Sequence, residues 1–101
     1  MQARSVASAS RRPAGFVVRL LRVAVHSSAL KHGLAVEDIE HAVRNAMVSD
    51  DLDDDLRLHL GPSRSGSLLE VIVIVRESGR SELAIHAMAM REKYRRLLPG
   101  E

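Results

Sequence analysis

Hydrophobic and polar residues alternate in several short stretches of the chain, and a period of two is the pattern of a strand with one buried face. This pattern predicts strands over residues 56–60 and 83–87, and residues 20–25 (LLRVAV) are β-branched and apolar enough for a first strand, which can begin at Phe16. Residues 68–75 are apolar apart from Glu70, which is typical of a central strand that is covered on both faces. The alternation therefore predicts a sheet of three to four strands.

Turn-forming residues separate the last three of these strands. Residues 61–66 (GPSRSG) are rich in Gly, Pro and Ser, and residues 77–80 (ESGR) contain a Ser-Gly pair. Connections this short join neighbouring strands that run in opposite directions, so we expect an antiparallel meander. Residues 49–55 (SDDLDDD) are polar and are also predicted to form a turn.

Helical periodicity appears most clearly over residues 35–48, where apolar residues recur at a spacing of three to four. Ala35 stands where a serine would complete a capping box with Asp38, so the start of this helix lacks about 1 kcal/mol of stabilisation. A short helical turn is expected over residues 27–33. A C-terminal helix is expected from 90 to 98, where Pro99 follows.

The predicted order of elements is β-α-α-β-β-β-α. Helices packed on an antiparallel sheet of three to four strands make a two-layer α+β domain. The chain has 101 residues, which is a common size for a single domain. Residues 1–15 are rich in Ser, Ala and Arg and lack a sustained apolar period, so we expect a disordered basic tail followed by one domain over 16–101.

Composition narrows the chemistry that this domain can perform. The chain contains no cysteine, which excludes disulfides, thiolate metal sites and a cysteine nucleophile, and which fits a cytoplasmic location. Phe16 and Tyr94 are its only aromatic residues, so the core must be aliphatic and platforms for base stacking are scarce. No apolar run approaches the roughly 20 residues of a membrane-spanning helix, and we expect no membrane contact.

Charge is distributed unevenly along the chain. Residues 1–36 carry six basic and no acidic residues, and the remainder carries nine basic and thirteen acidic residues, which together give the net charge of +2. A basic N-terminal segment can meet nucleic acid or an acidic partner. The alternative interpretation is a solvated tail with no partner.

Metal ligation has little support in the sequence. None of the five histidines forms the paired spacing of a zinc-binding helix. The acidic run over residues 50–55 lacks the glycine and the distal glutamate of an EF-hand loop, and it is interpreted as a solvated turn. We therefore predict no metal site and no cofactor.

The outward positions of the predicted sheet form the most interesting candidate site. Side chains two residues apart share a face of a strand, so Arg57 and His59 point the same way. If all strands bury their aliphatic residues on one side, His86 lies on the same open face, with Glu70 joining according to register and Arg91 at the border. Histidines can act as general acid and base, and arginines can stabilise charge on a phosphate, so these residues fit metal-independent RNA cleavage. Outward strand positions are also polar in proteins that have no such activity.

The predicted C-terminal helix is basic. Its sequence places Lys93, Tyr94 and Arg95 together, and these residues can bind phosphate. Cations near the C-terminal end of a solvated helix are the alternative explanation.

Short motifs in these segments resemble BrnT-family toxins and related small actinobacterial proteins. Lys31-His32-Gly33-Leu34 before an acidic helix resembles their KHG motif. Residues 61–66 resemble a loop of the same family, and residues 85–94 (IHAMAMREKY) resemble a recurring IHAM-x-x-R-x-x-Y motif. The similarity covers roughly residues 22–98. At His86-Ala87-Met88 the better-known toxins have Ser-Ala-Arg, so His86 or Arg57 would take over the role of that arginine.

This resemblance implies a RelE-like fold and a toxin of a type II toxin–antitoxin pair, which cleaves RNA or inhibits translation and is silenced by an antitoxin protein. Five residues are carried over by matching position as candidate functional residues: Lys31, His32, Arg64, Arg91 and Tyr94. The sequence hypothesis is thus a toxin-like ribonuclease or translation inhibitor that binds RNA. The alternative is a non-catalytic module that binds a protein partner or a second copy of itself.

Overall fold

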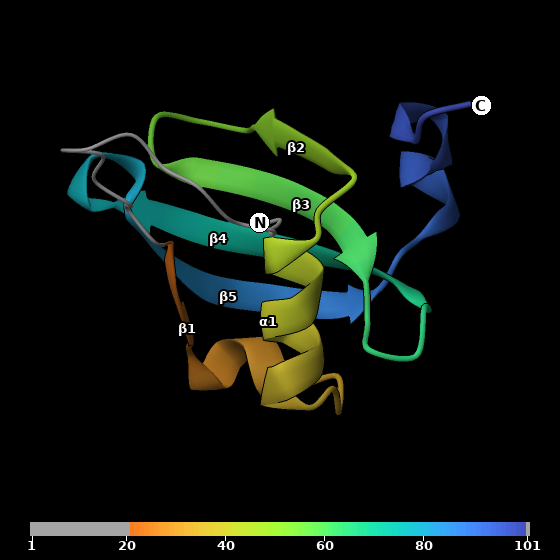
Figure 1. The fold of residues 1–101 in the computed structure, drawn as a ribbon, viewed down its shortest axis with the longest axis horizontal. Helices are drawn as coiled ribbons and strands as arrows, with labels where there is room; N and C mark the ends of the chain where they lie inside the picture. The colour runs from red at the N-terminus through yellow and green to blue at the C-terminus, as the bar shows by residue number, and fades with distance from the viewer. Residues whose placement is uncertain (1–20, 101) are drawn as a thin grey trace, which may run out of the picture.

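A computed structural model describes residues 21–100 of the chain (Figure 1). The expected tail over residues 1–15 and the expected start of the domain at 16–20 lie outside this range. The described elements are strand β1 (Arg22–Val25), 3-10 turn η1 (Ser27–Leu30), helix α1 (Val36–Arg44), strands β2 (Val48–Asp51), β3 (Leu56–Pro62) and β4 (Leu68–Arg76), 3-10 turn η2 (Glu77–Gly79), strand β5 (Ser81–Ala89) and 3-10 helix η3 (Glu92–Leu97).

The strands form one five-stranded sheet in the order β1-β5-β4-β3-β2. Strands β2 to β5 are joined as an antiparallel meander, and β1 pairs with β5 in the parallel direction. After β1 the chain passes through η1 and α1 to the far edge of the sheet, and the meander then brings it back beside β1 (Figure 1). The predicted α+β class, the meander of the last three strands and the central position of β4 are confirmed.

Strand β2 corrects the prediction that residues 49–55 form only a turn. Val48 to Asp51 pair with Leu60 to Arg57 of β3, which lengthens the meander by one strand. Three of these four residues are exposed, because an edge strand that covers little of the core has no need of an apolar face. A polar edge strand of this kind carries no alternating signal, so its pairing with β3 could not be read from the sequence.

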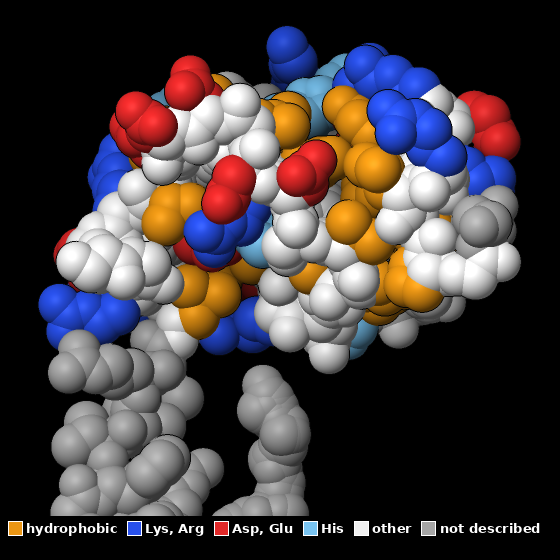
Figure 2. Space-filling model, turned by 90° about the horizontal axis from the view of Figure 1, so that it is seen from above, with side chains coloured by type: hydrophobic (Ala, Val, Ile, Leu, Met, Phe, Trp, Pro, Cys, Tyr) orange, Lys and Arg blue, Asp and Glu red, His pale blue; other side chains and the backbone are white. Residues whose placement is uncertain are grey.

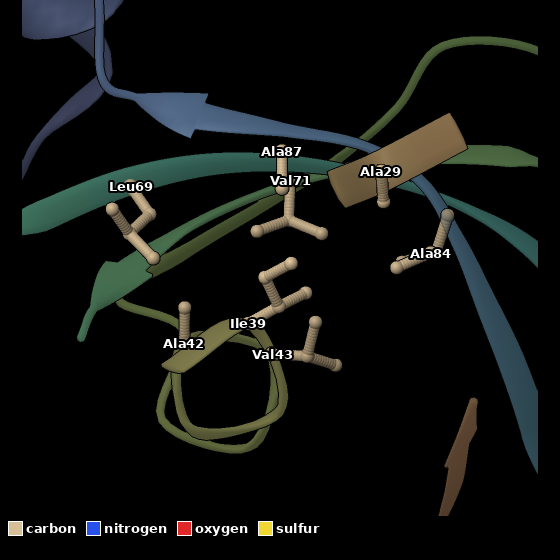
Figure 3. Packing of buried hydrophobic residues seen from close by; sticks show 9 residues of the cluster. Ala29, Ile39, Ala42, Val43, Leu69, Val71, Ala84 and Ala87 are labelled. Carbon is tan, nitrogen blue, oxygen red and sulfur yellow. The ribbon is translucent and has the colours of Figure 1, made fainter. Parts of the chain in front are cut away.

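Helix α1 packs across one face of the sheet and forms the main core (Figure 3). Ile39, Ala42 and Val43 are buried on its inner side, as the helical period predicts, and they meet Val71 of β4 and Ala84 of β5. The helix ends at Arg44 and not at residue 48, since the backbone N–H of Met47 donates to Leu60 and the chain has already turned toward β2. Hydrogen bonding to β3 therefore ends the helix before residue 48, although the helical spacing of apolar residues continues.

The N-terminus of α1 lacks a side-chain cap, as predicted. Ala35 occupies the cap position with extended backbone angles, and no side chain bonds the free N–H groups. We expect Ala35→Thr to be more stable to urea than Ala35→Val by about 1 kcal/mol, because Thr and Val have the same shape but only Thr supplies a side-chain oxygen for a free backbone N–H of the first turn. Equal stability of the two variants would show that the helix start is satisfied without a cap.

The opposite face of the sheet is partly covered by the C-terminal segment. Leu58 and Leu60 of β3 pack against Leu98, with Tyr94 and Leu97 of η3 and Ile72 of β4 beside them. The predicted C-terminal helix is therefore present, but it is a 3-10 helix and shorter than residues 90–98. The α1 face of β4 is largely buried and its other face is at least partly buried, which explains why its sequence is apolar almost throughout.

Helix length also bears on membrane contact. Within residues 21–100 no helix is long and apolar enough to cross a bilayer.

Candidate functional site

The four predicted catalytic residues lie on two opposite faces of the sheet. His59 pairs directly with Val71, which belongs to the core under α1, whereas His86 pairs with Ile72, which packs toward η3. Directly paired residues of antiparallel strands project to the same side, so Arg57 and His59 are on the α1 face and His86 is on the η3 face. The prediction that they share one open face is wrong.

A β-bulge in β5 is one physical reason for this separation. Ile72 pairs with His86 while Val73 pairs with Ala84, so Ile85 is an extra residue in β5. The bulge shifts the alternation by one, and Ala84 and Ala87 both reach the core under α1 although they are three residues apart. A second reason is that Leu58 and Leu60 face η3 and not α1.

On the η3 face a fully buried carboxylate organises three of the polar groups, and we call Glu70, His86 and Arg91 the Glu70 network. Glu70 accepts hydrogen bonds from Arg91 Nη2 at 2.7 Å, from the Arg91 backbone N–H at 2.9 Å and from His86 Nε2 at 3.0 Å. The Glu70 side chain is 0% exposed, while His86 is 23% and Arg91 44% exposed. The buried carboxylate of Glu70 therefore positions the guanidinium of Arg91 and the imidazole of His86, both of which reach the surface.

Glu70 stays ionised despite its burial. Desolvation raises its pKa, but the hydrogen bonds from the Arg91 side chain, the Arg91 backbone and His86 outweigh this effect and lower the pKa to about 2. A carboxylate can only accept, so His86 Nε2 carries the proton of that hydrogen bond. When the imidazole is neutral, its Nδ1 then holds a lone pair and can act as a base.

Further sequence-predicted residues gather beside this network. The ring of His32 meets that of His86 edge-on, with centroids 5.8 Å apart. The guanidinium of Arg91 lies 5.8 Å and the ammonium of Lys93 5.0 Å from the centre of the Tyr94 ring. Two motifs that are far apart in sequence, around His32 and around His86 to Tyr94, thus meet in space.

On the α1 face a second buried carboxylate organises Arg57 and His59, and we call Ser49, Asp51, Arg57, His59 and Glu82 the Glu82 network. Glu82 is bonded by His59 Nε2 at 2.7 Å and by Arg57 Nη1 at 3.2 Å. Arg57 Nε also donates to Asp51 at 2.7 Å, and Ser49 Oγ lies 2.8 Å from His59 Nδ1. The β2 edge of the molecule shows acidic, basic and histidine side chains next to one another (Figure 2).

The remaining candidates stand apart from both networks. Arg64 donates to Asp38 in the first turn of α1, through its backbone N–H at 3.0 Å and Nε at 2.8 Å, and its side-chain hydrogen bond lowers the pKa of Asp38. Arg95 pairs with Glu92 within η3. Lys31 is exposed at the end of η1, adjacent to His32.

In the described part of the chain, no group of three or more His, Asp or Glu side chains is placed to hold a metal ion.

The sequence reasoning missed Glu82 and Ser49 and treated Glu70 only as a neighbour. A signal for the two glutamates exists, since each lies in a strand of mostly apolar residues. A buried carboxylate is costly without partners, so an isolated glutamate in such a strand predicts a cation or a histidine beside it. Ser49 has no comparable signal, because β2 itself was not predicted.

No family model matches this chain, and the searches of curated proteins and of solved structures found no match. The two networks are therefore the basis for a functional argument.

Proposed function

We propose that this protein is a toxin-like, metal-independent ribonuclease whose active site is the Glu70 network with His32. The observation that carries the proposal is the pair of imidazoles, His32 and His86, with ring centroids 5.8 Å apart beside an arginine held by a buried carboxylate. Two adjacent imidazoles supply the base and the acid that cleavage of RNA through its own 2′-hydroxyl requires.

The reaction divides among these side chains as follows. His86 Nδ1 takes the proton of the ribose 2′-hydroxyl, and the 2′-oxygen forms a bond to phosphorus as the bond to the 5′-oxygen breaks. His32, in its protonated form, gives a proton to the departing 5′-oxygen, which leaves a 2′,3′-cyclic phosphate. Arg91 uses two of its nitrogens on Glu70, and its remaining donors can stabilise charge on the phosphate.

Neighbouring residues extend this surface for RNA. Lys93 supplies a further positive charge for a phosphate, and Tyr94 is the one aromatic ring within residues 21–100 on which a base can stack. Both cations lie close to the Tyr94 ring, at 5.8 Å and 5.0 Å from its centre, so the charges and the ring can contact the same stretch of RNA. Arg57 and His59, on the other face, take no part in this reaction.

The toxin assignment rests on the resemblance of the KHG and IHAM motifs to BrnT-family toxins. The proximity of these two motifs in space supports a common site. We propose in addition that the fold is RelE-like, that the protein acts in the cytoplasm, and that an antitoxin protein silences it by covering the His32–His86 surface.

A non-catalytic interaction module is the second candidate, and the β2 edge favours it. Met47 is 49% and Leu52 is 48% exposed, and they flank the two ends of this edge strand. An exposed edge strand with apolar residues beside it can accept a strand from a protein partner. This function would leave RNA intact and would depend on β2 and not on the histidines.

The test is cleavage of end-labelled RNA by the purified full chain in EDTA. We expect discrete fragments from the wild type and a fall in rate of about 10²- to 10⁴-fold for His32→Gln and for His86→Gln, because each removes one proton-transfer group. His26→Gln is the matched control, since His26 is also exposed and bonds Ser28 within η1. A cell-free translation reaction with the same variants tests whether the protein cleaves its RNA only on the ribosome, since such cleavage would inhibit translation.

Cleavage that stops in EDTA, or that His26→Gln slows as much as His86→Gln, would refute the assigned site. Intact RNA together with uninhibited translation would refute the ribonuclease proposal and favour the interaction module.

A further inference from the structure

Three side chains of the Glu82 network form a serine–histidine–glutamate relay on the α1 face. Ser49 Oγ lies 2.8 Å from His59 Nδ1, and His59 Nε2 lies 2.7 Å from Glu82 Oε1. The three residues come from β2, β3 and β5, so the sheet assembles them from distant parts of the chain. Ser49 is exposed at the edge, whereas the side chains of His59 and Glu82 are 6% and 3% exposed.

The hydrogen bonds of the relay have one consistent direction. Glu82 also binds the guanidinium of Arg57 at 3.2 Å, so it is a carboxylate and can only accept. His59 Nε2 must then donate to Glu82, which leaves the lone pair of neutral His59 on Nδ1. When His59 is neutral, the hydroxyl of Ser49 therefore donates to its Nδ1. This is the arrangement in which an imidazole can remove the proton from a serine.

The strand geometry adds a donor next to the serine. The backbone N–H of Leu52 donates to Leu56 O, and hydrogen-bonded pairs alternate along antiparallel strands. Ser49 and Asp51 consequently fall at positions whose backbone N–H groups point away from β3, toward the open edge. Of the two, only the N–H of Ser49 lies close enough to bond the oxygen of a carbonyl that Ser49 attacks, because residues two apart in a strand are separated by about 7 Å.

We propose that Ser49 is the nucleophile of a second active site, which transfers the acyl group of small activated esters to water. Ser49 Oγ forms a bond to the carbonyl carbon while its proton passes to His59 Nδ1. The alcohol leaves with that proton, and an acyl-serine remains. Water then attacks the acyl carbon, gives a proton to His59 Nδ1, and releases the acid as Ser49 recovers its proton. Glu82 is a positioning residue that orients the imidazole.

Charge around the serine selects the class of substrate. Asp50 and Asp51 are exposed next to Ser49 on β2. Asp50 projects to the opposite face from Ser49. Asp51 shares the cation of Arg57 with Glu82, which leaves one net negative charge beside the serine. This charge disfavours an anionic acyl group or leaving group, so neutral or cationic esters fit the site better. Ser49 is exposed on an edge strand, so a short acyl chain, which needs little enclosure, fits the site.

Labelling with a neutral fluorophosphonate tests the nucleophile directly. Attack by Ser49 forms an O–P bond and expels fluoride, so we expect one adduct, located on Ser49 by peptide mass spectrometry. Ser49→Ala should remove the adduct, and it should fold normally because Ser49 is exposed. Ser67→Ala, which changes another exposed serine, should label like the wild type. Hydrolysis of p-nitrophenyl acetate should fall in Ser49→Ala and stay at the wild-type rate in Ser67→Ala.

Variants of His59 and Glu82 test the relay. His59→Gln should label at least about 10²-fold more slowly, since the base is lost. Glu82→Gln should label more slowly than the wild type and Glu82→Asp should restore part of the rate, because a carboxylate accepts from Nε2 and so keeps Nδ1 free to act as the base. Thermal melting of these variants shows whether they are folded.

No adduct on Ser49, or equal labelling of Ser67, would overturn the proposal. A folded His59→Gln variant that labels at the wild-type rate would do the same. None of these results depends on RNA cleavage, because the two sites lie on opposite faces of the sheet.

Discussion

Glu70→Gln is expected to lower the free energy of unfolding by about 3 kcal/mol at neutral pH. The side chain is fully buried and its two oxygens accept hydrogen bonds from Arg91 and His86. A glutamine keeps the shape of the side chain but removes its charge. Its amide N–H groups would also point at the N–H donors of Arg91 and His86, with which they cannot form hydrogen bonds. Arg91 would then lack the anion that holds it against the sheet. Urea unfolding at neutral pH measures the change.

The same carboxylate should make the stability of the wild type depend on acid. The folded pKa of Glu70 is about 2, which is below the value of roughly 4.3 for an unfolded chain. The contribution is therefore fully present above roughly pH 4.3 and is lost as pH falls toward the folded pKa of about 2. Glu70→Gln should show a smaller loss of stability over this window than the wild type.

Glu92→Gln is the control for this prediction. Glu92 pairs with Arg95 on the surface of η3, and exposed pairs contribute little. We expect the control to unfold like the wild type at each pH. A Glu70→Gln variant that is as stable as this control would mean that the buried network contributes nothing net to folding.

Gly61→Ala is expected to destabilise the protein by about 3 kcal/mol. A Cβ atom at this position would lie 2.2 Å from the backbone oxygen of Ala42 and 3.1 Å from Cα of Ala46. Neither contact involves a flexible side chain, so the end of α1 must move away from β3. The buried residues Ala42 and Val43 would lose part of their packing with the sheet. Thermal and urea unfolding measure the change.

Gly33→Ala separates this steric effect from backbone strain. Gly33 has a φ of +85°, but no atom lies within 4 Å of an added Cβ. Its replacement should cost about 1 kcal/mol, because only the left-handed conformation is penalised. If Gly61→Ala is no worse than Gly33→Ala, then α1 does not pack against β3 as closely as described.

The candidate site was predictable residue by residue but not as an arrangement. The sequence identified His32, His86, Arg91 and Tyr94, and the structure brings them together around Glu70. It also identified Arg57 and His59, but these residues belong to a separate network on the other face. Residue types with acid–base or cationic chemistry are visible in a sequence, whereas the face on which they lie depends on neighbouring strands.

Local patterns alone determined the elements with a strong period. The apolar spacing over Ile39 to Val43 predicted α1, and the apolar run over residues 68–75 predicted β4 at the centre of the sheet. The turn over residues 77–80 was predicted from its composition, and Gly79 there has a positive φ. These features follow from side-chain spacing and backbone preference, which act between residues close in sequence.

Only the tertiary structure decided the rest. The polar strand β2 exists because β3 offers it hydrogen bonds, and Gly61 lies within β3 and not in a loop because α1 approaches it there. The extra residue Ile85 reverses the alternation of β5 and sends His86 and Glu82 to opposite faces. Each of these outcomes depends on contacts between residues far apart in the chain, and the period of a single segment carries no information about such contacts.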